Sequence, residues 1–122
     1  MKAVARALRP GARFVVDTQI AETLLPGFRE RGWWRVEDIL VVEERRYDHV
    51  RGRVEAEWTL IRKGTEETRP ISIRVYTYRE LSRLLERAGF SDCEGYGSLD
   101  REPFRLGAPR LYLVGTRDGR VI

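Results

Sequence analysis

Apolar residues recur with a helical period at the start of the chain and then run consecutively. Met1–Leu8 has apolar residues at helical spacing and is followed by Pro10 and Gly11, so a helix is expected to end there. Arg13–Asp17 holds consecutive apolar residues between turn signals, a pattern typical of a strand covered on both faces in a parallel sheet. A short helix is predicted over Ile20–Leu25. The opening segment therefore predicts helix, strand and helix.

The middle of the chain changes to the alternation of apolar and polar residues that half-buried strands show. Three strands are predicted, at Ile39–Asp48, Arg53–Arg62 and Thr68–Tyr76. The second strand directs its apolar residues to one face: Val54, Ala56, Trp58 and Leu60. The third strand is expected to direct its apolar residues inward: Ile71, Ile73 and Val75. The joins DHVRG and KGTEE are turn-like, so the segment is interpreted as an antiparallel meander with one face in solvent.

A helix is predicted next, over Tyr78–Ala88. Thr77 suits the N-cap and Glu80 follows three residues later, which predicts a capping box. The stripe expected to be buried is Leu81, Leu84, Leu85 and Ala88. Gly89 is expected to end the helix.

The remainder predicts a strand at Phe90–Gly97, a loop at Asp100–Pro109 and a final strand at Arg110–Thr116. The tail Arg117–Ile122 is expected to fray. These elements place the chain in the α/β class, as an α+β domain when taken alone.

The composition mainly excludes certain partners, disulfides and metal sites. The 122 residues suit one globular domain, with 42% hydrophobic and 34% charged residues. The net charge of +4 is spread along the chain, so no nucleic-acid partner is expected. Nearly all cationic residues are arginine, which points to a GC-rich or thermophilic source. One cysteine, Cys93, and one histidine, His49, exclude an internal disulfide and a four-ligand zinc site, so no metal is expected. No long apolar run is present, so we expect a cytoplasmic protein with no membrane partner.

Three segments in order, LRPGARFVVDT, YTYRELSRLLERAGF and PRLYLVGTR, resemble the C-terminal half of a class I S-adenosylmethionine-dependent methyltransferase of the small-molecule type. In that family a leucine-x-proline-glycine-glycine sequence precedes the fifth strand, and Ala12 here replaces the second glycine. The helix before the family's sixth strand ends in alanine, glycine and phenylalanine, which Ala88, Gly89 and Phe90 match. Arg110–Thr116 matches the antiparallel seventh strand.

The resemblance implies a partial class I methyltransferase fold within a single domain. Residues 1–32 and 77–117 would supply strands 5, 6 and 7 of a partial Rossmann-like sheet. Residues 33–76 would form a three-stranded antiparallel insertion that roofs the substrate pocket.

The family binds S-adenosylmethionine on its first half, where a glycine-rich loop follows the first strand. No G-x-G-x-x-G turn follows a strand in this sequence. We therefore expect no cofactor bound by this chain alone, and S-adenosylmethionine only where an N-terminal half completes the fold.

The resemblance also implies that the strand at Phe14–Val16 pairs on one side with a strand that this chain lacks. An exposed edge of this kind recruits another strand. We expect a homo-oligomer such as a homodimer, or a missing N-terminal methyltransferase half, to cover it.

Candidate substrate-binding residues follow the first strand and end the meander. Asp17 and Thr18, with Gln19 beside them, lie where α/β folds bind ligands; the alternative is that Asp17 or Thr18 caps the next helix. The resemblance implies that Arg74 and Tyr76 face the substrate, with the arginine clamping a carboxylate or phosphate. The alternative for Arg74 is a solvated strand face with a cross-strand pair to Glu55 or Glu57.

Aromatic residues of the meander offer a further hypothesis. An aromatic pocket for a methyl acceptor or a methylated cation would use Trp34 with Trp33, Trp58 and Tyr47. The alternative is that Trp58 packs in the core. Trp33 and Trp34 are adjacent and point in opposite directions in a strand, so one of them is expected to be exposed or at an interface.

The other reactive side chains are expected to have structural rather than catalytic roles. His49 is interpreted as an exposed turn residue rather than a general base, and Cys93 as a semi-buried strand residue rather than a nucleophile. The meander glutamates are interpreted as members of cross-strand ion pairs: Glu43, Glu44, Glu55 and Glu57.

The sequence thus supports a methyltransferase portion that supplies the small-molecule acceptor pocket and is inactive alone. The alternative is a non-catalytic, dimeric α+β module that binds a ligand or a protein. A nucleic-acid binder is a weaker reading, because acidic residues alternate with the basic ones.

Overall fold

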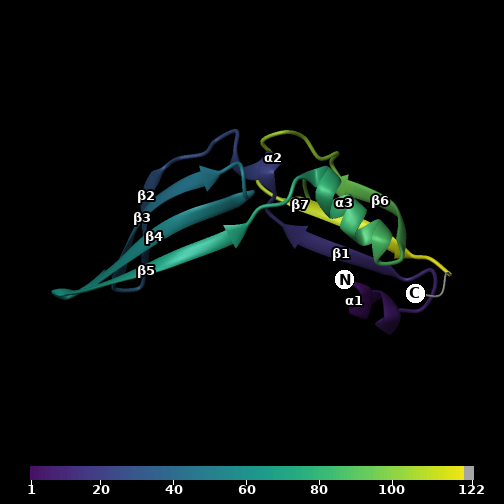
Figure 1. Cartoon of the computed structure of the whole chain (residues 1–122), viewed down its shortest axis with the longest axis horizontal. Coiled ribbons are helices and arrows are strands. Elements are labelled where there is room, and N and C mark those ends of the chain that lie inside the picture. The colour runs from purple at the N-terminus through teal and green to yellow at the C-terminus, as the bar shows by residue number, and fades with distance from the viewer. Residues whose placement is uncertain (120–122) are drawn as a thin grey trace. The chain divides into compact units, whose positions relative to one another are not determined.

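The computed structural model describes residues 1–119, which form two compact units (Figure 1). Unit 1 comprises Met1–Gly27 together with the chain from Tyr76 onward, and unit 2 comprises Phe28–Val75. The sequence predicted an insertion over 33–76; the inner unit begins earlier because it includes an additional strand. Of the tail expected to fray, Arg117 ends a strand, and residues 120–122 lie outside the described part.

Unit 1 combines three helices with a three-stranded sheet. Its elements are α1 (Lys2–Ala7), β1 (Arg13–Thr18), α2 (Ala21–Leu24), α3 (Tyr78–Arg87), β6 (Phe90–Tyr96) and β7 (Leu111–Arg117). The strand order is β1-β7-β6, and β7 is antiparallel to both neighbours. Strand β1 is therefore an edge strand in the described part of the chain.

The core of unit 1 lies on one face of this sheet. It consists of Ala5, Ile20, Leu81, Leu85, Ala88, Phe90, Leu111 and Leu113. Phe14 of β1 stacks on Phe90, with ring centroids 5.4 Å apart. The opposite face of β1 is open, since Val15 is 52% exposed. The prediction that β1 is covered on both faces is therefore wrong for the described residues: its exposure alternates along the strand.

Helix α3 begins at Tyr78, as the sequence predicts, and ends at Arg87, one residue before the predicted Ala88, which is its C-cap. The Thr77 hydroxyl accepts a hydrogen bond from the Glu80 amide at 3.1 Å, and the Glu80 carboxylate accepts one from the Thr77 amide at 3.0 Å. These bonds form the capping box. Gly89 has a φ of 106°, the left-handed conformation that ends many helices.

Unit 2 is a four-stranded antiparallel sheet, one strand more than predicted. Its strands are β2 (Arg31–Val36), β3 (Ile39–Asp48), β4 (Arg53–Arg62) and β5 (Thr65–Arg74), in that spatial order. Strand β2 was missed because Gly32 and charged neighbours interrupt its apolar pattern. Strand β5 begins before the predicted Thr68 because Lys63 and Gly64, with φ of 40° and 80°, close a two-residue turn.

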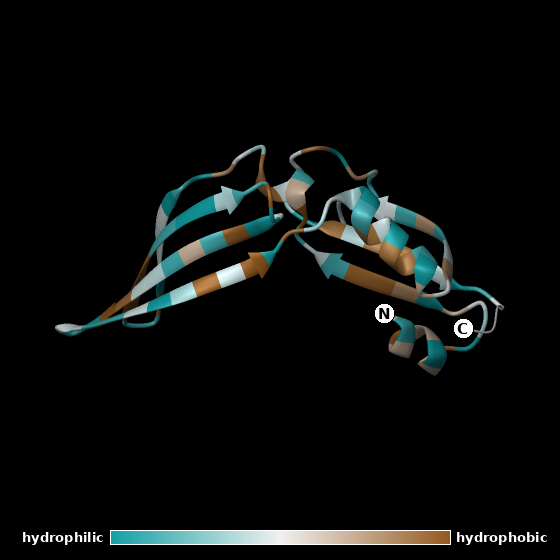
Figure 2. Ribbon diagram, in the orientation of Figure 1, coloured by the Kyte–Doolittle hydropathy of each residue, from teal (hydrophilic) through white to brown (hydrophobic). Residues whose placement is uncertain are grey.

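Side chains alternate between the two faces of unit 2, and Figure 2 shows this alternation as bands of hydropathy along the strands. Val41 and Val54 are buried on one face, 5% and 7% exposed. Ile73 lies on the same face of the edge strand β5 but is 54% exposed, so its predicted inward position is wrong. An edge strand has a neighbour on one side only, which explains why its last apolar residue stays in solvent.

No helix among residues 1–119 is long and apolar enough to cross a membrane.

Candidate functional site

The carboxyl end of β1 carries a charged pair. Asp17 Oδ1 accepts a hydrogen bond from Arg110 Nε at 2.6 Å, and both side chains are about half exposed. This hydrogen bond raises the pKa of Arg110 above its usual value. The Thr18 hydroxyl donates to the backbone carbonyl of Gln19 at 3.3 Å. The side-chain amide of Gln19 donates to the backbone carbonyl of Pro109 at 3.4 Å. The end of β1 is thereby linked to the segment that leads into β7.

The alternative that Asp17 or Thr18 caps the following helix is wrong. The N-cap of α2 is Ile20, whose amide donates to the Thr23 hydroxyl at 2.8 Å. The Thr23 hydroxyl donates in turn to the Ile20 carbonyl at 2.7 Å. A residue inside the helix therefore satisfies the first turn, and the polar residues that end β1 take no part in it.

An open cleft of about 410 Å³ lies in unit 1 beside α2. Its lining residues are Ala21, Glu22, Leu25, Pro26, Thr77 and Leu106. Leu25 and Leu106 are 37% and 76% exposed, so the cleft presents apolar side chains to solvent. Such a surface suits an apolar portion of a ligand.

The two polar side chains that line this cleft, Glu22 and Thr77, already form hydrogen bonds within the protein. Both carboxylate oxygens of Glu22 accept from the Tyr78 amide, at 3.1 and 3.2 Å. The Thr77 hydroxyl accepts from the Glu80 amide in the capping box. The Glu22 carbonyl accepts from the Gly107 amide at 2.9 Å, which holds the Leu106 loop against α2. The cleft is thus built by the start of α3, α2 and this loop.

Tyr78 contacts the loop that carries Leu106. Its ring packs on Phe104 with centroids 5.7 Å apart. A Cβ atom on Gly95 would lie 2.6 Å from the Tyr78 hydroxyl and 2.8 Å from its Cζ, so the ring needs glycine at this position of β6. Burial raises the pKa of Tyr78.

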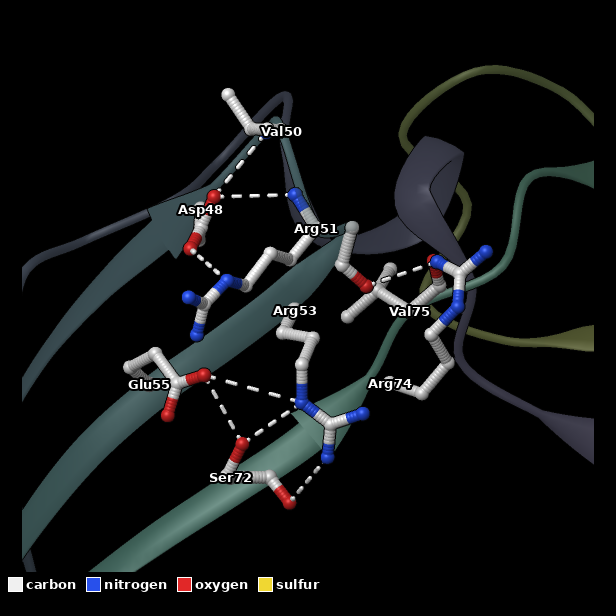
Figure 3. Close-up of polar contacts among 9 residues, drawn as sticks. Asp48, Val50, Arg51, Arg53, Glu55, Ser72, Arg74 and Val75 are labelled. Atoms are coloured by element: carbon white, nitrogen blue, oxygen red, sulfur yellow. Dashed lines mark hydrogen bonds and ion pairs between the residues drawn. The ribbon is translucent and has the colours of Figure 1, made fainter.

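Arg74 ends β5 and lies against backbone rather than along a strand face. Its Nη1 donates to the Gly52 carbonyl at 2.9 Å and to the Val75 carbonyl at 2.6 Å (Figure 3). Of the two glutamates expected as its cross-strand partner, Glu57 lies opposite Pro70 and Glu55 lies opposite Ser72. Glu55 contacts Arg53, with 3.8 Å between Arg53 Nε and Glu55 Oε1. The Ser72 hydroxyl donates to the same Glu55 oxygen at 3.0 Å.

Tyr76 does not share a strand face with Arg74, because β5 ends at Arg74. Tyr76 packs against the core of unit 1, and its carbonyl accepts from the Ala21 amide at 2.8 Å. The predicted pair of substrate contacts therefore divides between the two units.

Trp34 and Trp58 meet in unit 2, edge to face, with ring centroids 5.4 Å apart. The Trp58 indole donates to Glu43 Oε2 at 2.7 Å. Trp33 points to the opposite face and is 69% exposed. The prediction that one of the adjacent tryptophans is exposed is confirmed, and Trp33 is separated from the pair that forms the aromatic cluster.

His49 and Cys93 lie where the sequence predicts, as an exposed turn residue and a half-buried strand residue. His49 is exposed in the β3–β4 turn, which Asp48 stabilises by accepting from the amides of Val50 and Arg51 at 3.1 Å (Figure 3). These bonds, that to Arg51 above all, lower the pKa of Asp48. Cys93 is half-buried, and burial raises the pKa of its thiol.

The meander glutamates differ from the prediction of cross-strand ion pairs. Glu43 pairs with Arg45 of its own strand, at 3.6 Å, and Glu55 pairs with Arg53 of its own strand. Glu44 lies opposite another carboxylate, Glu57. No group of three or more histidine, cysteine, aspartate or glutamate side chains within residues 1–119 is arranged to hold a metal ion.

Sequence reasoning missed Arg110, Glu22 and Leu106. The register of β1 against β7, with Thr18 opposite Leu111, would have placed Arg110 beside the end of β1. Glu22 and Leu106 lie in a four-residue helix and a loop, where no periodic pattern marks a role.

No protein-family model matches the sequence, and no curated protein matches it. Solved structures do match. The CcbJ methyltransferase from Streptomyces caelestis superposes with a TM-score of 0.76 at 17% identity, over 95% of this chain and 50% of that chain. An S-adenosylmethionine-dependent methyltransferase from Clostridium acetobutylicum gives 0.70 at 14% identity, over 97% and 49%. CalS10, an amino pentose methyltransferase from Micromonospora echinaspora, gives 0.56 at 22% identity, over 95% and 48%.

The chain spans about half the length of each of these structures. The likeness covers nearly all of the chain, including the β1-β7-β6 sheet and the four-stranded insertion. The predicted fold is therefore confirmed: the chain has a partial S-adenosylmethionine-dependent methyltransferase fold.

Proposed function

We propose that the chain is the acceptor-binding portion of a small-molecule methyltransferase. The observation that carries the proposal is the β1-β7-β6 sheet of this fold, with an apolar cleft beside the helix that follows β1. Folds of this class bind ligands outside the carboxyl ends of their strands. The proposed acceptor contacts are Asp17 and Thr18 at the end of β1, with Leu25 and Leu106 in the cleft.

The residues of the cleft do not fit S-adenosylmethionine. That molecule carries a carboxylate, an ammonium group and ribose hydroxyls, each of which requires a polar partner. Glu22 and Thr77 already bond to backbone amides, and the other lining side chains are apolar. The sequence has no glycine-rich turn after a strand to hold the methyl donor. We therefore assign the donor site to a polypeptide segment other than these 122 residues.

Strand β1 supports this assignment because its free edge is unprotected. By contrast, the ten-residue edge strand β5 carries Pro70 and mostly charged or polar neighbours, which discourage pairing with another strand. Phe14, Val15 and Val16 of β1 offer no such protection. We propose that a strand of the donor-binding segment pairs with β1.

The contribution of the chain to catalysis would then be positioning. A reactant held in the correct geometry reacts as though it were intramolecular. The apolar cleft would hold the non-reacting part of the acceptor, and the Asp17–Arg110 pair would face its polar part. Because CalS10 is an amino pentose methyltransferase, amino sugars are a reasonable first set of acceptors to test.

Titration calorimetry tests the proposal directly. The chain alone should give no heat with S-adenosylmethionine, whereas it should bind acceptors from an amino sugar panel. Leu106→Ser should weaken acceptor binding. Leu99→Ser is the matched control, because Leu99 is 83% exposed near the same loop and does not line the cleft.

Micromolar binding of S-adenosylmethionine by the chain alone would contradict the assignment of the donor site. Acceptor binding that is unchanged by Leu106→Ser would contradict the cleft. A chain that binds no acceptor and forms a stable dimer would instead support the alternative, a non-catalytic α+β module.

A further inference from the structure

The apolar cleft beside α2 contains one charged side chain, that of Glu22, which is half-buried. None of the other lining residues carries a charge: Ala21, Leu25, Pro26, Thr77 and Leu106. Glu22 forms no ion pair within 4.0 Å among residues 1–119, although lysine and arginine outnumber aspartate and glutamate by 23 to 19 in the whole chain. The cleft therefore combines apolar walls with a carboxylate that has no cation of its own.

Three segments of unit 1 hold Glu22 in place. Its carboxylate accepts from the amide of Tyr78, the first residue of α3, at 3.1 and 3.2 Å. Its backbone carbonyl accepts from the Gly107 amide at 2.9 Å, and the neighbouring Ala21 amide donates to the Tyr76 carbonyl at 2.8 Å. A side chain fixed in this way loses little conformational freedom when a ligand binds to it.

The Glu22 carboxylate retains capacity to accept further hydrogen bonds. An ionised carboxylate offers about four lone-pair positions, whereas its two oxygens share the one N–H group of Tyr78. No other donor within residues 1–119 forms a hydrogen bond with this carboxylate. Because the surrounding walls are apolar, its attraction for a cation is weakened less than it would be in open water.

We propose that Glu22 makes the cleft selective for a cationic amine joined to an apolar body, an inference that rests on the proposed function. The ammonium N–H groups donate to the remaining lone pairs of Glu22, and Leu25 and Leu106 contact the apolar body. A ligand that also carries a carboxylate is disfavoured, since Glu22 repels it and no lining side chain is cationic. The selected class is therefore amines without an anionic group, which separates the acceptor from S-adenosylmethionine and from free amino acids.

A purely structural role for Glu22 makes a different prediction. A carboxylate beside the first turn of a helix stabilises it through the helix dipole. Glutamine still accepts from the Tyr78 amide through its side-chain carbonyl, so Glu22→Gln keeps the contact with α3 and removes the charge. The urea midpoint of this variant should stay close to that of the wild type, and its ligand preference then reports the charge rather than the fold.

Three probes of similar shape separate the charge from the apolar contact: cyclohexylmethylamine, cyclohexylmethanol and cyclohexanecarboxylate. In titration calorimetry of the whole chain at neutral pH and low salt, the amine should bind at least about tenfold more tightly than the alcohol, because a charged hydrogen bond is stronger than a neutral one. The carboxylate should not bind. The preference for the amine should shrink as the salt concentration rises, whereas binding of the alcohol should change little.

Variants assign this preference to Glu22. In Glu22→Gln the amine and the alcohol should bind within about twofold of each other, because both then form neutral-acceptor hydrogen bonds. Glu86→Gln, the same change at an exposed position of α3, is the matched control and should keep the full preference. In amide-detected NMR spectra, the amine should shift the Tyr78 resonance of the wild type, since that amide donates to the same carboxylate.

The outcomes distinguish this inference from the proposed function. An alcohol that binds the wild type as tightly as the amine, or a preference that survives Glu22→Gln, refutes the role of Glu22 and leaves the cleft as a binding site. A wild-type chain that binds neither the amine nor the alcohol contradicts the acceptor cleft and this inference together. Binding of the alcohol that Leu106→Ser weakens supports the cleft independently of the charge.

Discussion

Gly95 gives the sharpest test of how unit 1 is packed. Its backbone φ is not in the left-handed region, so alanine is compatible with the local conformation. The difficulty is space: the added Cβ would approach the hydroxyl and Cζ of Tyr78 to 2.6 and 2.8 Å. The whole ring, which is held between β6 and Phe104, would have to move.

The magnitude follows from two opposing contributions. Forcing an extra methyl group into a packed site costs about 1–3 kcal/mol. Replacing glycine where the backbone permits it returns about 0.4–1 kcal/mol through the unfolded state. Gly95→Ala should therefore destabilise unit 1 by about 1–2 kcal/mol. In a Tyr78→Ala background the clash is gone, and the same substitution should be neutral or stabilising.

Urea denaturation of the four proteins of this double-mutant cycle measures the coupling. Circular dichroism at 222 nm follows unit 1, which contains all helices of the described residues. Fluorescence follows unit 2, which contains all three tryptophans, and it should change little. A coupling below about 0.5 kcal/mol, the lower limit for residues in contact, would refute the packing of Tyr78 against Gly95.

Further predictions concern the start of α3 and the response to alkali. Thr77→Ala should destabilise unit 1 by about 1 kcal/mol in urea, while Thr77→Ser should retain most of the stability because its hydroxyl still accepts the Glu80 amide. Burial raises the pKa values of Cys93 and Tyr78 from the usual 9.0 and 10.0, and both groups are neutral when protonated. Their contribution to stability is complete below those usual values and is lost as the pH rises through the folded-state pKa values. The urea midpoint should thus fall above pH 9.0, less steeply in Cys93→Ser; an unchanged slope in that variant would contradict the assignment to the thiol.

Regular elements were predictable where one periodic signal dominates. Helix α3 has a capping box, an apolar stripe and a terminal glycine that agree, and the structure reproduces all three. Strand β2 was missed because two arginines and a glycine mask its alternation, and pairing with β3 decides its structure instead. Val15 was expected to be covered because consecutive apolar residues usually mark a central strand.

Parts of the candidate site could not be read from the sequence because tertiary contacts create them. Asp17 meets Arg110 across 93 positions, and Glu22 meets Tyr78 across 56. Short-range patterns contain no information about such distant partners. Tyr76 illustrates the reverse case, since its alternation with Arg74 suggested a shared face although the strand ends between them.

The two positions at which the chain passes between unit 1 and unit 2 have an evolutionary consequence. The chain leaves unit 1 after Gly27 and returns at Tyr76, where a backbone hydrogen bond from Ala21 anchors it. Every member of the unit 1 core lies outside this interval. Recombination at these two junctions can exchange the intervening arm for one of different length without rebuilding the interior. Such an arrangement lets unit 2 vary between related chains while the scaffold that receives it is inherited unchanged.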